Sequence, residues 1–302
     1  MRNIGYIKNP EYFQDDYLHS LESLCVTRED REYWLKLLEP YLQEETPKSQ
    51  EAEYAEYPVL ELISTKLRLL LDLGRKDDYY CLMKQYYSHS PNLCLSYARA
   101  LNDDGKPEQS VNVAEECLSL FPDYMTRPIR VFLNEIYERS DAGKYKENLM
   151  WLFLNTNEWR YYETLRASFP ESWSDILAKI VDSLSQDHFG INRLINVYLR
   201  EEMYEVALKK VLESGCISTL ANYHQDLAGR YPDEYFKAYR ELIHSFASKE
   251  TGRRHYKDVV SYLRKMGEIK GFESQFSEFV VQLRQENRRK PAFIDEMRAL
   301  VV

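Results

Sequence analysis

Histidine, cysteine and carboxylate side chains are the residues of this chain that could bind a metal or catalyse a reaction. The five cysteines form no C-x-C or C-x-x-C pair, and the six histidines are dispersed. The chain contains no glycine-rich phosphate loop, no G-x-S-x-G and no H-E-x-x-H motif. We therefore predict no catalytic residue, no metal site and no cofactor, and a protein that is not an enzyme.

Two histidines leave one alternative open. His224 and His244 would face each other if they lie on neighbouring helices, and two facing histidines can bind a metal. Because no third ligand stands at a suitable spacing, we interpret them as interhelical or surface residues. Acidic pairs such as Asp77-Asp78 and Asp103-Asp104 are typical of helix starts and turns, where carboxylates accept free backbone N–H groups.

The cysteines are widely spaced and odd in number, and most lie in apolar helical stretches. A free cysteine in such a stretch packs as a small hydrophobic residue, which is typical of a reducing cytoplasm. We therefore expect free thiols and a cytoplasmic location. The cysteines are Cys25, Cys81, Cys94, Cys117 and Cys216.

Composition narrows the class of protein further. Among 302 residues, 44% are hydrophobic and 29% are charged, which is too apolar and too evenly charged for a disordered chain. The 10 glycines and 11 prolines are too few for turn-dense β folds. The beginning of the sequence has no apolar core of signal-peptide length, and no apolar run is long enough to span a membrane. We expect a soluble, mostly helical protein with no membrane partner.

Charge is unevenly distributed along the chain, whose net charge is −9. From Asp233 to Val302, fourteen Lys and Arg residues stand against eleven Asp and Glu, so this end carries an excess of three positive charges. In the simplest interpretation, this uneven distribution is ordinary surface charge that serves solubility. The alternative is that the C-terminal end contacts an acidic partner. Its candidate basic patch consists of Arg253, Arg254, Arg288, Arg289 and Lys290.

Apolar residues recur with helical periodicity throughout the sequence. One example is Ile191, Leu194, Ile195, Tyr198 and Leu199, which share one face of a helix. Glycines and prolines separate such runs at intervals that leave helices of about 10–17 residues joined by tight turns. The pattern predicts an all-α fold, an irregular α-solenoid of about fifteen helices paired as antiparallel hairpins.

The segment from Pro91 to Pro122 resembles a tetratricopeptide repeat. Gly105 lies at its turn, and small residues stand where its second helix must cross the first closely; these are Ser110, Ala114 and Cys117. A second match, Ile191 to Val211, has Glu202 in place of the turn glycine. A third, Phe132 to Leu152 around Gly143-Lys144-Tyr145, is weaker because Asn148 stands where a small residue belongs.

The tetratricopeptide resemblance implies which side chains would meet a ligand, because the first helix of each such unit lines the concave surface. The positions are Asn92, Arg99 and Asn102 in the first match, and Asn192, Asn196 and Arg200 in the second. Asparagine can donate to and accept from an extended peptide backbone, and arginine suits a carboxylate. The alternative is that these residues are simply the solvated side of amphipathic helices.

Tyrosine is the most abundant aromatic residue, with 25 copies that often stand in pairs such as Tyr79-Tyr80 and Tyr161-Tyr162. Two interpretations remain open. The rings pack between helices with their hydroxyls bonded to a carbonyl or to water, or they form a binding surface.

The C-terminal region carries a second resemblance. The stretches TGRRHYKDVVSYLRKM (Thr251 to Met266) and RRKPAFIDEMRAL (Arg288 to Leu300) resemble the end of the long helical region in SWIM zinc-finger family proteins. The resemblance covers about the last 70 residues. The C-x-C and C-x-H pairs of the zinc module are absent, so the resemblance implies a helical region alone, either a fragment or a relative without the metal module.

These observations define one functional expectation and one alternative. We expect three parts: an N-terminal helical segment (1–42), an acidic linker or loop (43–56) and a helical-repeat body (57–302). We expect a non-enzymatic helical-repeat scaffold that binds a protein or peptide partner. The alternative is a nucleic-acid-associated accessory region that uses the basic C-terminal end.

Overall fold

The computed structural model describes residues 25–50, 57–187 and 190–300 of the chain. Within these ranges the secondary structure is α-helix and short 3-10 helix, without a β-strand, so the all-α prediction is confirmed there. The chain divides into two compact units, unit 1 (residues 1–171) and unit 2 (residues 172–302). No helix in the described ranges is both long enough and apolar enough to cross a membrane.

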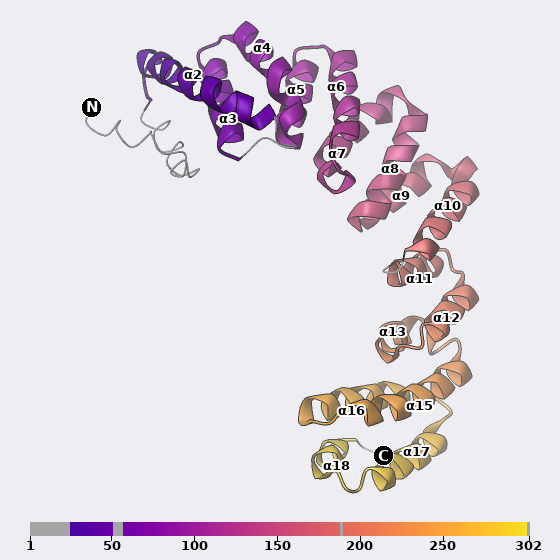
Figure 1. Cartoon of the computed structure of the whole chain (residues 1–302). Helices are drawn as coiled ribbons and strands as arrows, with labels where there is room; N and C mark the ends of the chain where they lie inside the picture. Colours follow the sequence, from indigo (N-terminus) through magenta and orange to yellow (C-terminus); the bar gives the residue numbers. More distant parts are fainter. Residues whose placement is uncertain (1–24, 51–56, 188–189, 301–302) are drawn as a thin grey trace. The chain divides into compact units, whose positions relative to one another are not determined.

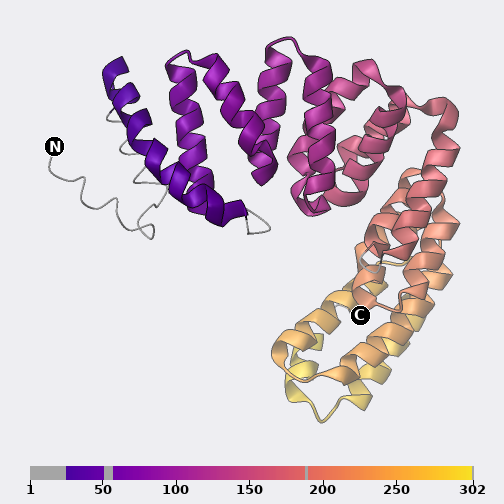
Figure 2. The same cartoon turned by 45° about the horizontal axis from the view of Figure 1, so that its top comes forward.

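Unit 1 contains eight described α-helices, each packed against the next one in the chain (Figure 1). They are α2 (Arg28–Gln50), α3 (Tyr57–Asp72), α4 (Lys76–Tyr86), α5 (Pro91–Asp103), α6 (Pro107–Leu120), α7 (Arg127–Ser140), α8 (Ala142–Thr156) and α9 (Trp159–Ser168). Helix α5 also contacts α7, the second helix after it. Unit 1 is therefore built from sequential helix pairs, and the views in Figures 1 and 2 agree on this chain-order packing.

The predicted N-terminal division lies partly within the described residues. Helix α2 continues through residue 50 and so includes the first part of the predicted linker at 43–56, whereas residues 51–56 lie outside the described residues. Residues 1–24 of the predicted N-terminal segment also lie outside them. Helices α2, α3 and α4 share one apolar core, centred on side chains such as Leu38, Ile63 and Leu70. The division at 43–56 stays a prediction.

Several helices of unit 1 begin where the sequence provides a cap. The Ser90 hydroxyl accepts the backbone N–H of Leu93 at 3.2 Å, and Pro91 occupies the first helical turn, where its missing N–H costs little. The Asp141 carboxylate accepts the N–H groups of Gly143 and Lys144, both at 3.0 Å, and so starts α8. The third predicted turn, at Gly143-Lys144-Tyr145, is therefore wrong by a few residues, because the break lies at Asp141.

Unit 2 contains nine described α-helices. They are α10 (Trp173–Gln186), α11 (Ile191–Arg200), α12 (Tyr204–Glu213), α13 (Ile217–Asn222), α14 (His224–Leu227), α15 (Pro232–Lys249), α16 (Arg253–Gly267), α17 (Glu273–Glu286) and α18 (Pro291–Met297). Helix α15 packs against α16, and α18 returns to pack on α16, with the rings of Tyr256 and Phe293 stacked at 4.9 Å between centroids. Helix α15 contributes the fully buried rings of Tyr235 and Tyr239 to the core of unit 2.

Three helix pairs share one connector geometry. Gly74, Gly105 and Glu202 each adopt a left-handed conformation, with φ of 70°, 73° and 58°. In each connector this residue donates its N–H to the carbonyl three residues back, and the next residue donates to the carbonyl five residues before itself. These paired bonds satisfy the last carbonyls of a helix. The second helix then starts two residues after the left-handed residue in α3–α4, α5–α6 and α11–α12.

Candidate functional site

The predicted close crossing of α5 and α6 is present. Ser110, Ala114 and Cys117 have no exposed surface, and Ala98 on α5 is equally buried. The Ser110 hydroxyl donates to the Ala98 carbonyl at 2.6 Å, a side-chain bond that ties the two helices together. Small side chains are needed here because a larger one would hold the hydroxyl away from the facing backbone.

The third and weaker repeat match, Phe132 to Leu152, contains a polar version of the same crossing, between α7 and α8. Asn148 on α8 is 4% exposed, and its amide nitrogen donates to the Arg130 carbonyl at 2.8 Å and to the Asn134 side-chain oxygen at 3.2 Å. An asparagine at this position therefore does not prevent helix pairing, because its amide bonds the facing helix as the serine hydroxyl does in α5–α6.

The expectation of free thiols is wrong for two cysteines. Cys94 and Cys117 form a disulfide between α5 and α6, with their Cα atoms 6.6 Å apart. The physical reason is the hairpin itself. Cys94 lies eleven residues before Gly105 and Cys117 lies twelve after it, so antiparallel pairing places them at the same height. Of the other three, Cys81 and Cys216 are exposed and Cys25 is half-buried.

The predicted ligand-binding positions of the first match lie on α5. Asn92 and Arg99 are exposed and Asn102 is half-buried, opposite the buried stripe that includes Leu93 and Leu101. Their placement is that of the solvated side of an amphipathic helix, as both interpretations require.

The corresponding positions of the second match lie on α11 in unit 2. Asn192 and Arg200 are exposed, and Asn196 is half-buried. The Tyr223 hydroxyl, at the end of α13, donates to the Asn192 carbonyl at 2.9 Å and lies 3.5 Å from its side-chain oxygen. Asn192 is therefore positioned by a contact with the following helices, and Asn196 lies one turn further along α11.

The predicted basic patch is partly neutralised. Arg253, at the start of α16, forms ion pairs with Asp295 at 3.3 Å and Glu296 at 3.4 Å, both on α18. Arg254, Arg288 and Arg289 are exposed, and Lys290 is half-buried before α18. The partners of Arg253 thus come from the returning C-terminal helix, although Glu250 and Asp258 lie nearer to it in the sequence.

The two histidines of the metal alternative have different partners. His224 is 7% exposed; its Nε2 lies 3.4 Å from a Glu268 carboxylate oxygen, and its Nδ1 lies 3.3 Å from the Tyr239 hydroxyl. His244 is exposed, with Nε2 3.1 Å from Glu286. In the part of the chain that the structure describes, no cluster of three or more His, Cys, Asp or Glu residues is placed to hold a metal ion.

Burial and charge act in opposite directions on His224. Desolvation lowers the pKa of its imidazole, because burial disfavours the charged form, and the nearby Glu268 carboxylate opposes that effect while Lys265 adds to it. The result is a lowered pKa. Tyr235 donates its hydroxyl to the Tyr223 carbonyl at 3.1 Å in the same cluster. The tyrosines of this cluster are buried between helices, with the Tyr235 hydroxyl bonded to a carbonyl, and so they do not form an exposed binding surface.

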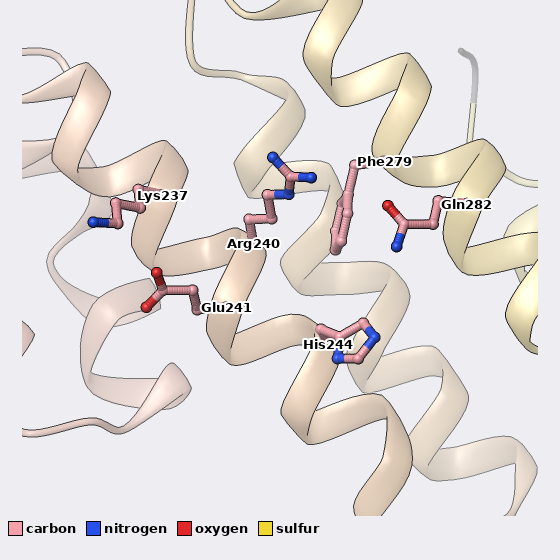
Figure 3. Close-up of a pocket in the computed structure, with 6 residues that line it drawn as sticks. All are labelled: Lys237, Arg240, Glu241, His244, Phe279 and Gln282. Atoms are coloured by element: carbon pink, nitrogen blue, oxygen red, sulfur yellow. The ribbon is translucent and has the colours of Figure 1, made fainter.

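A groove between α15 and α17 combines residues that the sequence interpretation did not bring together. It has a volume of about 660 Å³ and is lined by Lys237, Arg240, Glu241, His244, Phe279 and Gln282 (Figure 3). The first four follow one face of α15 at a spacing of three, four and seven residues. That spacing was a signal in the sequence. The contribution of α17 required knowledge of which helices pack together.

No family model matches the chain, and no curated protein matches it.

Proposed function

We propose that the chain is a non-enzymatic, tetratricopeptide-like helical-repeat scaffold that binds a protein or peptide partner. The observation that carries the proposal is the connector shared by α3–α4, α5–α6 and α11–α12, because repetition of one hairpin geometry is how helical-repeat proteins build extended binding surfaces. The polar residues on α5 and α11 are the proposed contact positions, considered separately in each unit.

Contacts between successive elements support the same proposal. The Tyr80 hydroxyl on α4 donates to Asp104 at 2.8 Å, next to Gly105 in the following connector. In unit 2 the indole N–H of Trp173 on α10 donates to Glu201 at 3.0 Å, next to Glu202. In both places an aromatic donor from the preceding helix bonds the carboxylate just before the left-handed residue, so the hairpin is anchored to the helix before it.

The α11 positions provide the test. Replacing both asparagines, Asn192→Ala with Asn196→Ala, should leave the circular-dichroism spectrum and melting temperature unchanged but weaken capture of the partners that the wild-type chain retains. A matched control, Gln275→Ala with Gln285→Ala, removes two exposed amides from α17 and should leave capture unchanged. Equal capture by all three proteins, each well folded, would contradict the proposal for α11.

The alternative is a nucleic-acid-associated region, and it rests on the exposed arginines Arg254, Arg288 and Arg289 and on the SWIM-like C-terminal sequence. Binding to oligonucleotides that weakens steeply with salt would favour it, because phosphate contacts release counterions. Alanine at all five basic-patch positions should then abolish that binding. Unchanged binding in the five-alanine variant would remove the basis of the alternative.

A further inference from the structure

The described cysteines are in two different states. Cys94 and Cys117 are bonded to each other and have no exposed surface, whereas Cys81 and Cys216 are exposed free thiols. Hydrogen bonding to Ser218 lowers the pKa of the Cys216 thiol to about 7, so much of it is thiolate near neutral pH. An exposed thiolate is readily oxidised, and it stays free only in reducing surroundings. The free thiols therefore indicate a protein suited to reducing surroundings.

That setting bears on the meaning of the Cys94–Cys117 bond. A disulfide in a protein from reducing surroundings is usually transient and senses the redox state, whereas permanent disulfides are typical of oxidising compartments. The bond also lies on a helix that carries proposed contact positions, because Cys94 stands on α5 between Asn92 and Arg99. Making and breaking the bond would therefore act on that helix.

The bond lies in the tightly packed crossing of α5 and α6. Cys94 and Ala98 are one turn apart on α5, and Ser110, Ala114 and Cys117 follow one face of α6. All five side chains are fully buried, and the Ser110 hydroxyl donates to the Ala98 carbonyl at 2.6 Å. The disulfide and this hydrogen bond thus join the same two helix faces.

Reduction removes more than a covalent link. Two sulfur atoms that are no longer bonded must move apart to van der Waals contact, at about 3.5 Å or more. The crossing offers them little room, because the small side chains of Ala98 and Ala114 are already fully buried there. We therefore expect α5 to move away from α6 on reduction, and that movement lengthens the hydrogen bond between Ser110 and Ala98.

Burial of the sulfur atoms couples their chemistry to the position of α5. Both cysteines are shielded from solvent, so a reductant reaches them only when α5 and α6 have separated. Opening of the hairpin and cleavage of the bond therefore favour each other. By the same linkage, a ligand that binds α5 in its closed position protects the bond from reduction.

We propose that the Cys94–Cys117 bond is a redox switch that holds α5 in its partner-binding position and releases it when a thiol reductant cleaves the bond. A thiolate of the reductant attacks one sulfur and forms a mixed disulfide, and a second thiol of the reductant then displaces that sulfur. Two electrons and two protons pass to the pair, which becomes two thiols, and the reductant leaves as a disulfide. The switch rests on the proposed scaffold function and gives its α5 surface a means of regulation.

The first experiment asks whether the bond exchanges in the folded, full chain. The wild-type chain is equilibrated without oxygen in glutathione buffers that range from mostly oxidised to mostly reduced, then quenched with acid, alkylated and analysed by mass spectrometry. The pair should be bonded in the oxidised buffers and at least about half reduced where reduced glutathione predominates. A pair that stays bonded in every buffer is a permanent structural bond and overturns the proposal, as does a pair that never bonds.

The second experiment measures whether the redox state controls binding on α5. Peptides are selected from a random dodecapeptide phage library on the oxidised wild-type chain. They are then sorted by the variant that loses them, either Asn92→Ala with Arg99→Ala or Asn192→Ala with Asn196→Ala. Peptides that depend on α5 should bind the reduced wild-type chain at least about tenfold more weakly than the oxidised chain. Peptides that depend on α11 should bind both forms equally, because α11 lies in the other unit.

Two cysteine variants separate the bond from thiols in general. Cys94→Ala with Cys117→Ala imitates the reduced state and should bind the α5-dependent peptides as weakly as the reduced wild-type chain does, with or without reductant. The matched control, Cys81→Ala with Cys216→Ala, removes two exposed thiols and should keep the full redox response. Circular dichroism shows that each protein is folded, and the reduced wild-type chain decides the outcome if the first variant is not. Loss of the redox response in the control would overturn the switch, because the response would then belong to other thiols.

The switch and the scaffold can fail separately. If peptides depend on α5 but bind the oxidised and reduced chains equally, the scaffold proposal stands and the switch is overturned. If the bond exchanges with glutathione but no selected peptide depends on α5, the scaffold proposal fails on that helix. The switch then fails with it, because it has no binding to control.

Discussion

The α5–α6 and α11–α12 hairpins share one connector but hold their helices together differently. In α5–α6, Ser110 bonds the Ala98 carbonyl and a disulfide joins the helices. Counted from the left-handed residue, the same two positions in α11–α12 are occupied by Ala207 and Ile195, both fully buried. The two hairpins therefore share a connector but differ at the crossing, where a hydroxyl ties the helices in α5–α6 and apolar side chains are buried in α11–α12.

The connectors themselves differ in one residue, and that difference shows how far packing can override local preference. Gly105 adopts its left-handed conformation without steric cost, and Glu202 adopts nearly the same conformation with a full side chain. Glu202 is held there by the same two backbone bonds and by the buried faces of α11 and α12. A glycine is therefore not required for this turn, although its absence costs stability.

The largest expected effect concerns the disulfide, which α11–α12 lacks. Reducing the Cys94–Cys117 bond should lower the stability of α5–α6 by about 3 kcal/mol, because it frees a loop of roughly two dozen residues in the unfolded chain. Amide hydrogen exchange resolved by peptide would show faster exchange in α5 and α6 and little change in α11 and α12.

Chemical labelling provides the control for that experiment. Alkylation of the unreduced, denatured chain should modify Cys25, Cys81 and Cys216 and leave the bonded pair intact. Modification of all five cysteines without reductant would contradict the disulfide and with it the expected loss of stability.

Exchanging the turn residues should sharpen the comparison of connectors. Gly105→Ala places a Cβ in a left-handed backbone and should destabilise the chain by about 1.5 kcal/mol, although nothing lies within 4 Å of that Cβ. Glu202→Gly should stabilise it by about 0.5 kcal/mol, because the relief of strain exceeds the added freedom of the unfolded chain. Thermal unfolding measures both changes.

The control for the turn exchange is Gly229→Ala, where the added Cβ also has open space but the backbone is not left-handed. It should be neutral or slightly stabilising. If Gly105→Ala is as harmless as this control, the left-handed connector does not strain a side chain and the comparison between Gly105 and Glu202 loses its physical basis.

A reciprocal exchange tests the crossing positions. Ser110→Ala removes the bond to Ala98 and should cost about 1 kcal/mol. Ala207→Ser should also cost about 1 kcal/mol, because the facing Ile195 keeps the opposite backbone out of reach and the new hydroxyl is buried without an interhelical partner. Melting temperatures of the two variants would show whether they fall together. A stabilising Ala207→Ser would mean that α11 and α12 approach as closely as α5 and α6.

The smallest expected effect is a pH dependence confined to unit 2. Burial lowers the pKa of His224, so below the ordinary histidine pKa of 6.5 the unfolded chain binds a proton that the folded chain does not. The stability contributed by neutral His224 is therefore complete above about pH 6.5 and decreases as the pH falls through that value. Hydrogen exchange corrected for its intrinsic rate should show α13–α15 loosening as the pH falls from about 7 to about 5, where histidine titrates. Over that range α5–α6 should not loosen, because its carboxyls Asp104 and Glu115, whose pKa values are lowered, titrate only in stronger acid.

A variant identifies the group responsible for the acid effect. His224→Gln keeps a polar side chain at the site but does not titrate, so the acid loosening of α13–α15 should disappear. Loosening that persists in this variant would assign the effect to other groups in the cluster, such as Glu268.

The sequence predicted the hairpins where the local signals were strong. Gly105 at the turn and the small residues Ser110, Ala114 and Cys117 on α6 were sufficient to place α5–α6, and the structure buries all three small residues. Glu202 was correctly placed at a turn although it is not a glycine. In these cases the chemistry of the turn and the apolar periodicity lie within about thirty residues, so local information determines the outcome.

Features that depend on contacts between distant residues were not predictable in the same way. The partners of Arg253 on α18 lie forty-two and forty-three residues away in the sequence, and the sequence offered nearer acids. The groove between α15 and α17 depends on which helices pack together, so the spacing of Lys237 and Arg240 alone did not identify it. The disulfide was missed although its cysteines are nearly equidistant from Gly105, because only the hairpin geometry gives that symmetry a meaning.

The Cys94–Cys117 bond also determines how the chain would extend under mechanical load. Because the cysteines are separated by 23 positions, a pulling force applied to the two ends passes through the sulfur atoms and bypasses the residues between them. At about 3.5 Å per extended residue, roughly 80 Å of contour length stays hidden until the bond is reduced. The turn at Gly105 and most of α5 and α6 would thus remain unstretched while the helices outside the bond are pulled apart.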